Sequence, residues 1–297
     1  MTEGQVVPPA ASPAGLRLNV LTRLYPAVLF RSPVGLAGAA ILLFWLAVAA
    51  FAPWIAPFSP TRSFMPVAPM MAAAPGGGRF WLGTDLLGRD LLSRLVWGTR
   101  SVVVYAPLAT ASAYVIGIAL GLWAGYRRGV TDMLLSRTAD LVLAFPVVPL
   151  YIVLLSKLGS SGFNIVFAIT LSTTPGVMRI MRGLTLDLRE QAYVAAARLR
   201  GEGTLAILFL EILPNARATL IADACMRLGY VVTAIGTLGF LGMGLPPPTP
   251  DWGGMIEEGR VLAILFPHLV LPPCLAIVSL ALGCSMLADG LRRGEGR

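Results

Sequence analysis

The chain has 297 residues, of which 56% are hydrophobic and only 13% are charged. Water-soluble globules carry charge on about a quarter of their residues, so this composition excludes an ordinary soluble domain. The formal net charge of +8 does not indicate nucleic-acid binding, because the cations lie between apolar segments and are not gathered with aromatic residues on one polar region. The sequence therefore predicts an integral membrane protein whose partner is the lipid bilayer, with no nucleic-acid partner.

The N-terminal part of the chain does not have the pattern of a secretory signal. Residues 1–18 are rich in proline, alanine and glycine and contain no apolar core. A signal peptide needs such a core followed by a small-residue cleavage site. We therefore predict that residues 1–32 form a cytoplasmic tail and that the first membrane segment is retained.

Six apolar stretches of roughly 18 to 28 residues are long enough to cross a hydrocarbon layer about 30 Å thick. We predict an all-α protein with six transmembrane helices, the first at 33–52 and the last five in a membrane core at 101–290. An external loop with an interfacial helix occupies 53–100, and the C-terminal tail is 291–297. The expected spans are about Val34–Phe51, Ser101–Gly125, Met133–Ser156, Phe163–Ile180, Ala216–Leu241 and Ala263–Met286, with kinks at Pro146, Pro149 and Pro175.

The distribution of arginine predicts the orientation of these spans. Six spans place both termini on one side, and cytoplasmic termini give the inner loops most of the cations, as the positive-inside rule requires. The loop 53–100 opposes this orientation, but long loops translocate largely regardless of charge. The inner cations are Arg17, Arg23, Arg31, Arg127, Arg128, the group within 179–217, Arg292, Arg293 and Arg297, and those of the outer loop are Arg62, Arg79, Arg89, Arg94 and Arg100.

Two pairs of opposite charge lie within the expected spans. Arg137 and Asp140 are three residues apart, and Asp223 and Arg227 are four apart, so each pair shares a helix face. Mutual neutralisation is the simpler explanation of both pairs. A place in the transport pathway is the alternative for Asp223 and Arg227, because charges inside a membrane are usually functional.

A polar segment between the fourth and fifth spans has the pattern of a short surface helix. Asp187 suits the N-cap, the residues to Arg200 are all compatible with a helix, and Gly201 suits the left-handed position after its end. Three alanines, at 195–197, make one face flat enough for close approach to another surface. That surface is either a protein groove or the membrane itself. Pro214 fits the first turn of the helix that follows.

This segment, within the loop 183–213, resembles the EAA loop of binding-protein-dependent ABC importer permeases. The resemblance implies a coupling helix that docks into a cleft of a cytoplasmic ATPase. One departure is Glu211, with Leu210 before it, where the family usually has a basic pair. The candidate ATPase-coupling residues are Glu190, Tyr193, Ala195, Ala196, Ala197, Gly201 and Pro214.

Further motifs are similar to the dipeptide/oligopeptide branch of that family (DppC/OppC-like). They are the stretch 83–94 before the second span, the stretches 238–244 and 247–253 after the fifth, and residues 288–292 at the end. We expect Thr84 or Asp85 to cap a helix along the outer interface, with Asp90 and Arg94 paired on it. The candidate residues of this external motif are Gly83, Thr84, Asp85, Gly88, Arg89 and Asp90.

The resemblance implies a type I importer permease with a MetI-like fold in a bacterial inner membrane. Its implied partners are a second permease subunit (DppB/OppB-like), two ATPase subunits that hold ATP and Mg, and an extracytoplasmic substrate-binding protein. The implied cargo is a di- or oligopeptide or a related small solute. The chain itself lacks a phosphate-binding Gly-Lys-Ser/Thr loop and any metal-ligand or catalytic set, so we expect no cofactor and no enzymatic activity.

The alternatives belong to two other classes of protein. A secondary active transporter would use an intramembrane Asp/Arg pair, for which Asp223 is the one candidate coupling residue. An intramembrane enzyme would need a Ser/His, paired-Asp or metal-ligand set, and the spans show none.

Overall fold

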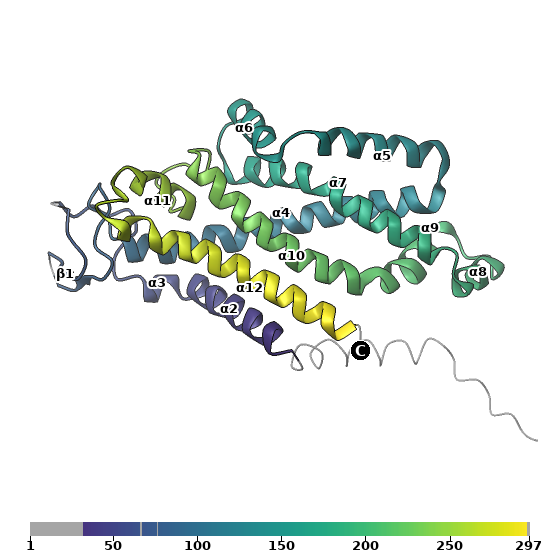
Figure 1. Ribbon diagram of the computed structural model, residues 1–297, viewed down its shortest axis with the longest axis horizontal. Helices are drawn as coiled ribbons and strands as arrows, with labels where there is room; N and C mark the ends of the chain where they lie inside the picture. The colour runs from purple at the N-terminus through teal and green to yellow at the C-terminus, as the bar shows by residue number, and fades with distance from the viewer. Residues whose placement is uncertain (1–31, 66, 76, 296–297) are drawn as a thin grey trace, which may run out of the picture.

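The computed structural model describes residues 32–65, 67–75 and 77–295 of the chain (Figure 1). The predicted N-terminal tail, apart from Ser32, lies outside these residues. Within the described part, five helical segments are long and apolar enough to cross a membrane. They are α2 (Pro33–Ala50), α4 (Leu91–Arg127), α7 (Gly162–Leu188), α10 (Leu213–Phe240) together with the helical turns from Thr204, and α12 (Leu271–Glu295).

A sixth candidate span is broken in two. Helix α5 (Gly129–Ala144) and helix α6 (Val147–Leu158) meet at an angle of 89°, and they are apolar enough to cross a membrane only when taken together. Pro146 lies at the break, and Phe145 before it has an extended backbone, because the proline ring disfavours the helical conformation of the preceding residue. The predicted kink is therefore a full change of direction.

Small residues bring the helices close together. Gly117, Gly121 and Gly125 follow one another at four-residue intervals on α4 and face α7. An added Cβ at Gly121 would lie 2.6 Å from the carbonyl oxygen of Met178, so a larger residue would push the two helices apart. Such small-xxx-small stripes let backbones approach and gain dispersion contacts where lipid gives no hydrophobic drive. On α2, Gly38 approaches the backbone of α12 in the same way.

The connecting segments gather at the two ends of the long axis (Figure 1). One end carries the first loop and the segment between α10 and α12. The other end carries the loop between α7 and α10. The first end comprises α3 (Ala52–Ile55), the hairpin of β1 (Ala72–Ala73) and β2 (Arg79–Phe80), α11 (Trp252–Gly259), η2 (Arg260–Leu262) and η3 (Pro267–Leu269), and the second comprises α8 (Ala192–Leu199), α9 (Thr204–Ala206) and the π-helical η1 (Ile207–Ile212).

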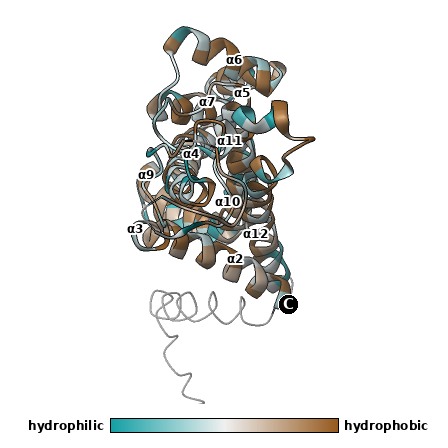
Figure 2. Ribbon diagram, turned by 90° about the vertical axis from the view of Figure 1, so that its left-hand side faces the viewer, coloured by the Kyte–Doolittle hydropathy of each residue, from teal (hydrophilic) through white to brown (hydrophobic). Residues whose placement is uncertain are grey.

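Large apolar side chains cover the outside of the bundle between these ends. Figure 2 shows hydrophobic residues along the outer helices. Leu43, Val115, Leu141 and Leu275 are each more than 60% exposed in the isolated chain. Patches of this extent mark a surface that meets lipid or another subunit.

Candidate functional site

The loop that carries the candidate coupling residues begins later than predicted. Helix α7 continues through Asp187 to Leu188, so Asp187 is not an N-cap. The short helix α8 starts at Ala192, after the extended residue Gln191. The apolar side chains of α7 extend the long helix past the polar residue, because tertiary packing overrides a local capping preference.

The two faces of α8 have different surroundings. Val194 and Ala197 are completely buried and belong to a cluster that includes Met181 of α7. Tyr193 is half-buried against the same cluster. The expectation of one flat face formed by all three alanines is therefore wrong for Ala197, which points inward. The outward stripe consists of Ala192, Ala195, Ala196 and Leu199, at the i, i+3, i+4, i+7 spacing, and Leu199 is 90% exposed.

The end of α8 is fixed by backbone geometry. Gly201 has φ +79°, the left-handed conformation that was predicted for it. Its N–H donates to the carbonyl oxygen of Arg198 at 3.0 Å, and the N–H of Glu202 donates to that of Ala197 at 3.2 Å. This pair of bonds is a Schellman motif, which satisfies the last carbonyls of a helix. A Cβ at Gly201 would meet nothing within 4 Å, so φ alone requires glycine there.

Charged side chains join the segment between α7 and α8 to the end of α4. Arg189 donates to the carbonyl oxygen of Tyr126 at 2.9 Å, and its Nε lies 3.1 Å from Glu190. Glu190 also lies 3.6 Å from Arg128, the residue between α4 and α5. Glu190 thus bridges two cations and holds the loop beside the α4–α5 junction.

Glu211 contacts the same loop from the other side. It lies on η1 with its side chain 13% exposed, and its Oε1 is 3.5 Å from Arg200. Arg200 is the C-cap of α8 and also binds Glu202 at 2.6 Å. The acidic departure from the family pattern is therefore partly neutralised within the chain. Pro214 lies in the first turn of α10, as predicted, although the chain before it is already helical.

The external motif folds as a turn instead of a helix. Gly83 and Gly88 have φ of +80° and +75°, and Thr84 donates to and accepts from the backbone of Ala68. The helix begins at Leu91, with Asp90 accepting from the N–H of Ser93 at 2.8 Å, so the expected caps Thr84 and Asp85 are wrong. The two glycines favour the turn because they adopt positive φ without strain. Residues 83–90 form no helix of their own, and the next helix is α4, which starts at Leu91.

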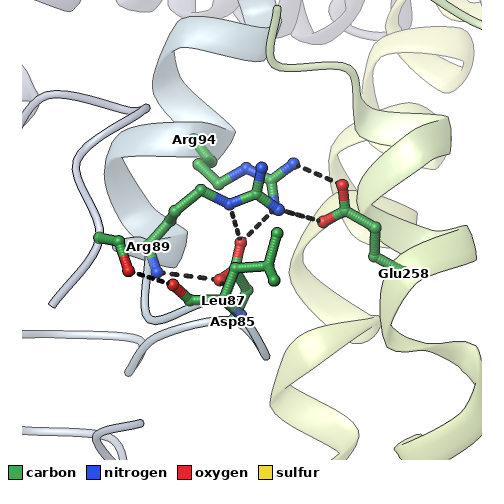
Figure 3. A network of polar contacts seen from close by, with 6 residues as sticks. Asp85, Leu87, Arg89, Arg94 and Glu258 are labelled. Atoms are coloured by element: carbon green, nitrogen blue, oxygen red, sulfur yellow. Dashed lines mark hydrogen bonds and ion pairs between the residues drawn. The ribbon is translucent and has the colours of Figure 1, made fainter. Parts of the chain in front are cut away.

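Asp85 binds arginines within a buried ion network (Figure 3). Its Oδ2 lies 2.6 Å from Arg89 and 2.5 Å from Arg94, and both arginines also bind Glu258 of α11, at 2.8 and 2.5 Å. Arg94 is 5% exposed and Asp85 6%. The predicted Asp90–Arg94 pair does not form. Sequence reasoning missed Glu258, because 164 residues separate it from Arg94 and no local spacing relates them.

Asp251 lies at the N-cap of α11, close to this network. Its Oδ2 accepts from the N–H of Gly254 at 3.1 Å, whereas its Oδ1 is buried with no hydrogen-bond partner among the described residues. Burial raises the pKa of Asp251 from 3.8 to about 6, although the charge of Arg94 and backbone donors oppose the shift. The end of the bundle that carries α11 therefore contains a carboxyl group whose pKa is about 6.

The intramembrane pair Asp223 and Arg227 is formed as predicted. The Nε of Arg227 lies 2.7 Å from Oδ2 of Asp223. The hydroxyl of Tyr114, from α4, donates to the same oxygen. The other predicted pair is looser: Arg137 lies 3.8 Å from Asp140, whose closer partner is Arg179 of α7. Sequence reasoning missed Tyr114, for which the one signal was a phenol in the middle of an apolar span.

The fold and these sites define a multi-pass permease whose helix α8 presents an exposed apolar stripe at one end. Residues 117–293 match the family described as binding-protein-dependent transport system inner membrane component, and residues 27–75 match the N-terminal TM domain of oligopeptide transport permease C. The chain belongs to this family of ABC importer permeases of the inner membrane. The all-α permease fold and the resemblance to dipeptide and oligopeptide permeases are thereby confirmed, and the secondary-transporter and enzyme alternatives fail.

Curated relatives cover most of the chain. The di/tripeptide transport system permease protein DppC of Pseudomonas aeruginosa is 37% identical over 84% of this chain and 84% of its own length. The dipeptide transport system permease protein DppC of Haemophilus influenzae is 37% identical over 86% and 88%, respectively. The glutathione transport system permease protein GsiD of Pectobacterium atrosepticum is 34% identical over 88% and 86%.

Proposed function

We propose that this chain forms one half of the translocation path of an ATP-driven importer for di- or oligopeptides or a related small solute. A second, DppB/OppB-like permease subunit completes the path, and an extracytoplasmic binding protein delivers the cargo. Two cytoplasmic ATPase subunits hold ATP and Mg and act on the permease through α8. The family and the names of the relatives, which refer to short peptides and glutathione, support this proposal.

The outward stripe of α8 is the observation that carries the docking proposal. Small side chains at Ala195 and Ala196 allow a partner's backbone to approach closely, and Leu199 offers an apolar anchor that is 90% exposed. Interface anchors of this kind fill a pocket of the partner. A loop helix that lay on lipid would need a wider apolar face than one stripe of three alanines and a leucine.

Force on this stripe can reach the membrane spans because the inner face of α8 is packed against them. Val194 and Ala197 share a cluster with Met181 of α7 and with Ile207 and Ile212 of η1. Helix α10 follows η1 directly. ATP-dependent closure of the ATPases would therefore move α7 and α10 together. The ATPases would then contact the permease differently in its two states, as coupling between ATP binding and permease conformation requires.

The proposed orientation places α8 and both termini in the cytoplasm. The cations Arg128, Arg189 and Arg198 lie at the α8 end, and the positive-inside rule favours the cytoplasmic side for such residues. A reporter fused after Arg128 is expected to read as cytoplasmic and one fused at Ala73 as external, because the junction of α4 and α5 and the strand β1 lie at opposite ends of the bundle (Figure 1). The reverse readings would contradict the orientation.

The docking proposal is tested by replacing one outward residue of α8. Ala196→Glu places a bulky charge on the stripe without entering the core, so the permease is expected to insert and fold normally. Purification of the whole importer should then recover at least tenfold less ATPase subunit, which corresponds to about 1.4 kcal/mol or more of binding free energy lost because the larger side chain prevents close approach. Uptake in vesicles should fall with it.

Two matched variants separate docking from folding. Ala196→Ser keeps a small side chain at the same position and should retain both the ATPase subunits and uptake. Val194→Ala removes buried methyl groups from the inner face, so it should lower the free energy of unfolding by about 2 kcal/mol while leaving the outward stripe intact. Normal ATPase recovery and uptake with Ala196→Glu would contradict the proposed docking.

A further inference from the structure

Helix α10 carries a polar stripe at membrane depth. Its members recur at three- or four-residue intervals, which places them within about 120° of one another around a helix with 100° per residue. A stripe of this kind on a span cannot face lipid without cost. It consists of Thr219, Asp223, Arg227, Tyr230, Thr233 and Thr237, of which Thr219, Tyr230 and Thr233 are exposed in the isolated chain.

The guanidinium of Arg227 lies in the middle of this stripe. Asp223 takes its Nε–H at 2.7 Å, and the terminal amines lie over Gly176 of α7, where a Cβ would come within 2.9 Å of Nη1. Gly176 thus leaves the space that the guanidinium occupies. Because arginine has five N–H donors in a planar fork, one bond to Asp223 leaves the group able to bind a second carboxylate.

The stripe continues into a cavity of about 380 Å³ toward the α8 end of the bundle. Its lining comes from three helices: Ile180 of α7, Asp223 and Thr219 of α10, and Arg292 of α12. Arg292 is exposed and lies 3.9 Å from the sulfur of Met226. Asp223 and Arg292 border this cavity, and Arg227 lies one helical turn further along the stripe, bound to Asp223. These two cations and one anion leave an excess of one positive charge.

We propose that the polar stripe of α10 lines the translocation path and that Arg227, followed by Arg292, receives the free carboxylate of a short peptide. This inference rests on the proposed importer function and adds to it the surface and the chemical group that are recognised. A carboxylate suits the excess positive charge, whereas the α-amine of the peptide finds Asp223 already bound by Tyr114 and Arg227. Weak, successive contacts of this kind let a solute enter and leave.

A purely structural ion pair gives a different expectation for exchanged charges. The variant Asp223→Arg/Arg227→Asp keeps opposite charges four residues apart on the same helix, so a pair that serves only for mutual neutralisation would survive the exchange. The path requires a cation at the position over Gly176, so transport would not survive it.

The test uses the whole importer in vesicles, with its binding protein outside, ATP inside and radiolabelled dialanine as the probe. Uptake and ATP hydrolysis are measured in the same vesicles. We expect Arg227→Gln and the exchanged pair to lower uptake on the order of tenfold, as loss of a charge-assisted contact implies, while ATP hydrolysis stimulated by the loaded binding protein stays within about twofold. Arg227→Lys should retain part of the uptake that Arg227→Gln loses. Arg137→Gln, which lies outside the cavity, should change neither uptake nor ATP hydrolysis.

A second measurement tests the lining without using transport. Thr233→Cys and Val278→Cys both place a thiol at an exposed position, the first on the stripe and the second on the outer face of α12. A membrane-impermeant thiol reagent should label the first above the unsubstituted chain and leave the second unlabelled.

Each failure has a distinct meaning. Wild-type uptake by the exchanged pair, or an unlabelled Thr233→Cys, would overturn the path inference and leave the importer function intact. Parallel loss of ATP hydrolysis and uptake in Arg227→Gln would show a structural role and overturn it as well. Absence of ATP-dependent uptake by the wild-type assembly would overturn the importer function and this inference together.

Discussion

At the end of the bundle with α11 and the β hairpin, distant segments are joined by buried charged side chains. At the α8 end the buried contacts are apolar, and each ion pair there has at least one partner that is more than half exposed. Arg94 is 5% exposed and binds carboxylates from two segments far apart in the sequence. Val194 is completely buried and belongs to an apolar cluster. At the end with α11, which we call the charged end, the charged groups bind one another within the chain. At the α8 end, one face of α8 is exposed in the part of the chain that the structure describes.

This difference separates a rigid end from an end that can accept a partner. A buried ion network holds its geometry because removing any member leaves charges without compensation. Apolar packing tolerates small displacements of a helix as long as the volume stays filled. We therefore expect the charged end to resist perturbation as a unit and the α8 end to transmit movement.

The largest expected effect comes from breaking the charged end. Arg94→Met keeps much of the side-chain volume but removes a guanidinium that two carboxylates share. The free energy of unfolding should fall by about 3 kcal/mol, at the lower end of the range for breaking a buried pair, because Arg89 still binds both Asp85 and Glu258. This loss is measured as a lower midpoint of thermal unfolding of the detergent-solubilised importer.

The matched control is Arg62→Met in the same loop. Arg62 is exposed and stacks over the ring of Phe64 at 4.8 Å, so its loss should cost less than about 1 kcal/mol. Equal shifts for the two variants would show that the network does not hold this end together.

The second effect is a pH dependence confined to the charged end. The pKa of Asp251 is raised to about 6 in the folded chain and is 3.8 without burial. The folded state therefore binds the proton more tightly, and this contribution to stability is complete below about pH 4 and is lost as the pH rises through 6. It amounts to about 3 kcal/mol over the whole window, because each pKa unit corresponds to 1.36 kcal/mol.

The measurement is hydrogen exchange of the backbone amides of α11 between pH 5 and 7.5, corrected for the intrinsic exchange rate. It reports the change in stability at the charged end, where Asp251 lies. Protection should decrease with rising pH in the wild type. Asp251→Asn should remove most of the slope, leaving the part due to Asp90, whose pKa is also raised by burial. Exchange in α8 serves as the internal control and should show no such slope. An unchanged slope in Asp251→Asn would refute this assignment.

The spans and the α8 loop could be predicted from local sequence because their signals are local. Apolar length predicted six spans, of which five are single helical segments and the sixth is a bent pair of helices. The glycine after the alanines predicted the end of α8. The start of α8 could not be predicted, because packing of α7 decides how far that helix runs past Asp187.

The network at the charged end could not be predicted for a different reason. Asp85 and Arg89 belong to a recognisable motif, yet their partner Glu258 approaches only through the docking of α11 on α4. Trp252 anchors this docking by donating to the carbonyl oxygen of Leu95 at 2.8 Å. Such contacts follow from tertiary structure and not from local spacing. The sequence therefore predicted a helix with an Asp90–Arg94 pair, whereas the segment forms a turn and Arg94 binds Asp85 and Glu258.

The smallest expected effect sharpens the comparison at the α8 end. Gly201→Val forces a β-branched residue into the left-handed region, where the side chain meets no neighbour within 4 Å and the cost is purely in the backbone. We expect about 1 to 2 kcal/mol of local destabilisation, with little change in the unfolding of the bundle. The bond from Glu202 to Ala197 should open more often, and hydrogen exchange of residues 192–202 should speed up accordingly.

Gly201→Asn is the matched variant, because asparagine tolerates the left-handed region at lower cost. It should show a smaller change in exchange and retain more of the ATPase subunits than Gly201→Val. If the ends of α8 must be fixed for docking, ATPase recovery should follow exchange protection across the two variants. Full recovery with Gly201→Val despite faster exchange would mean that the outward stripe docks without a fixed C-terminus, and the α8 end would then be more adaptable than its Schellman motif implies.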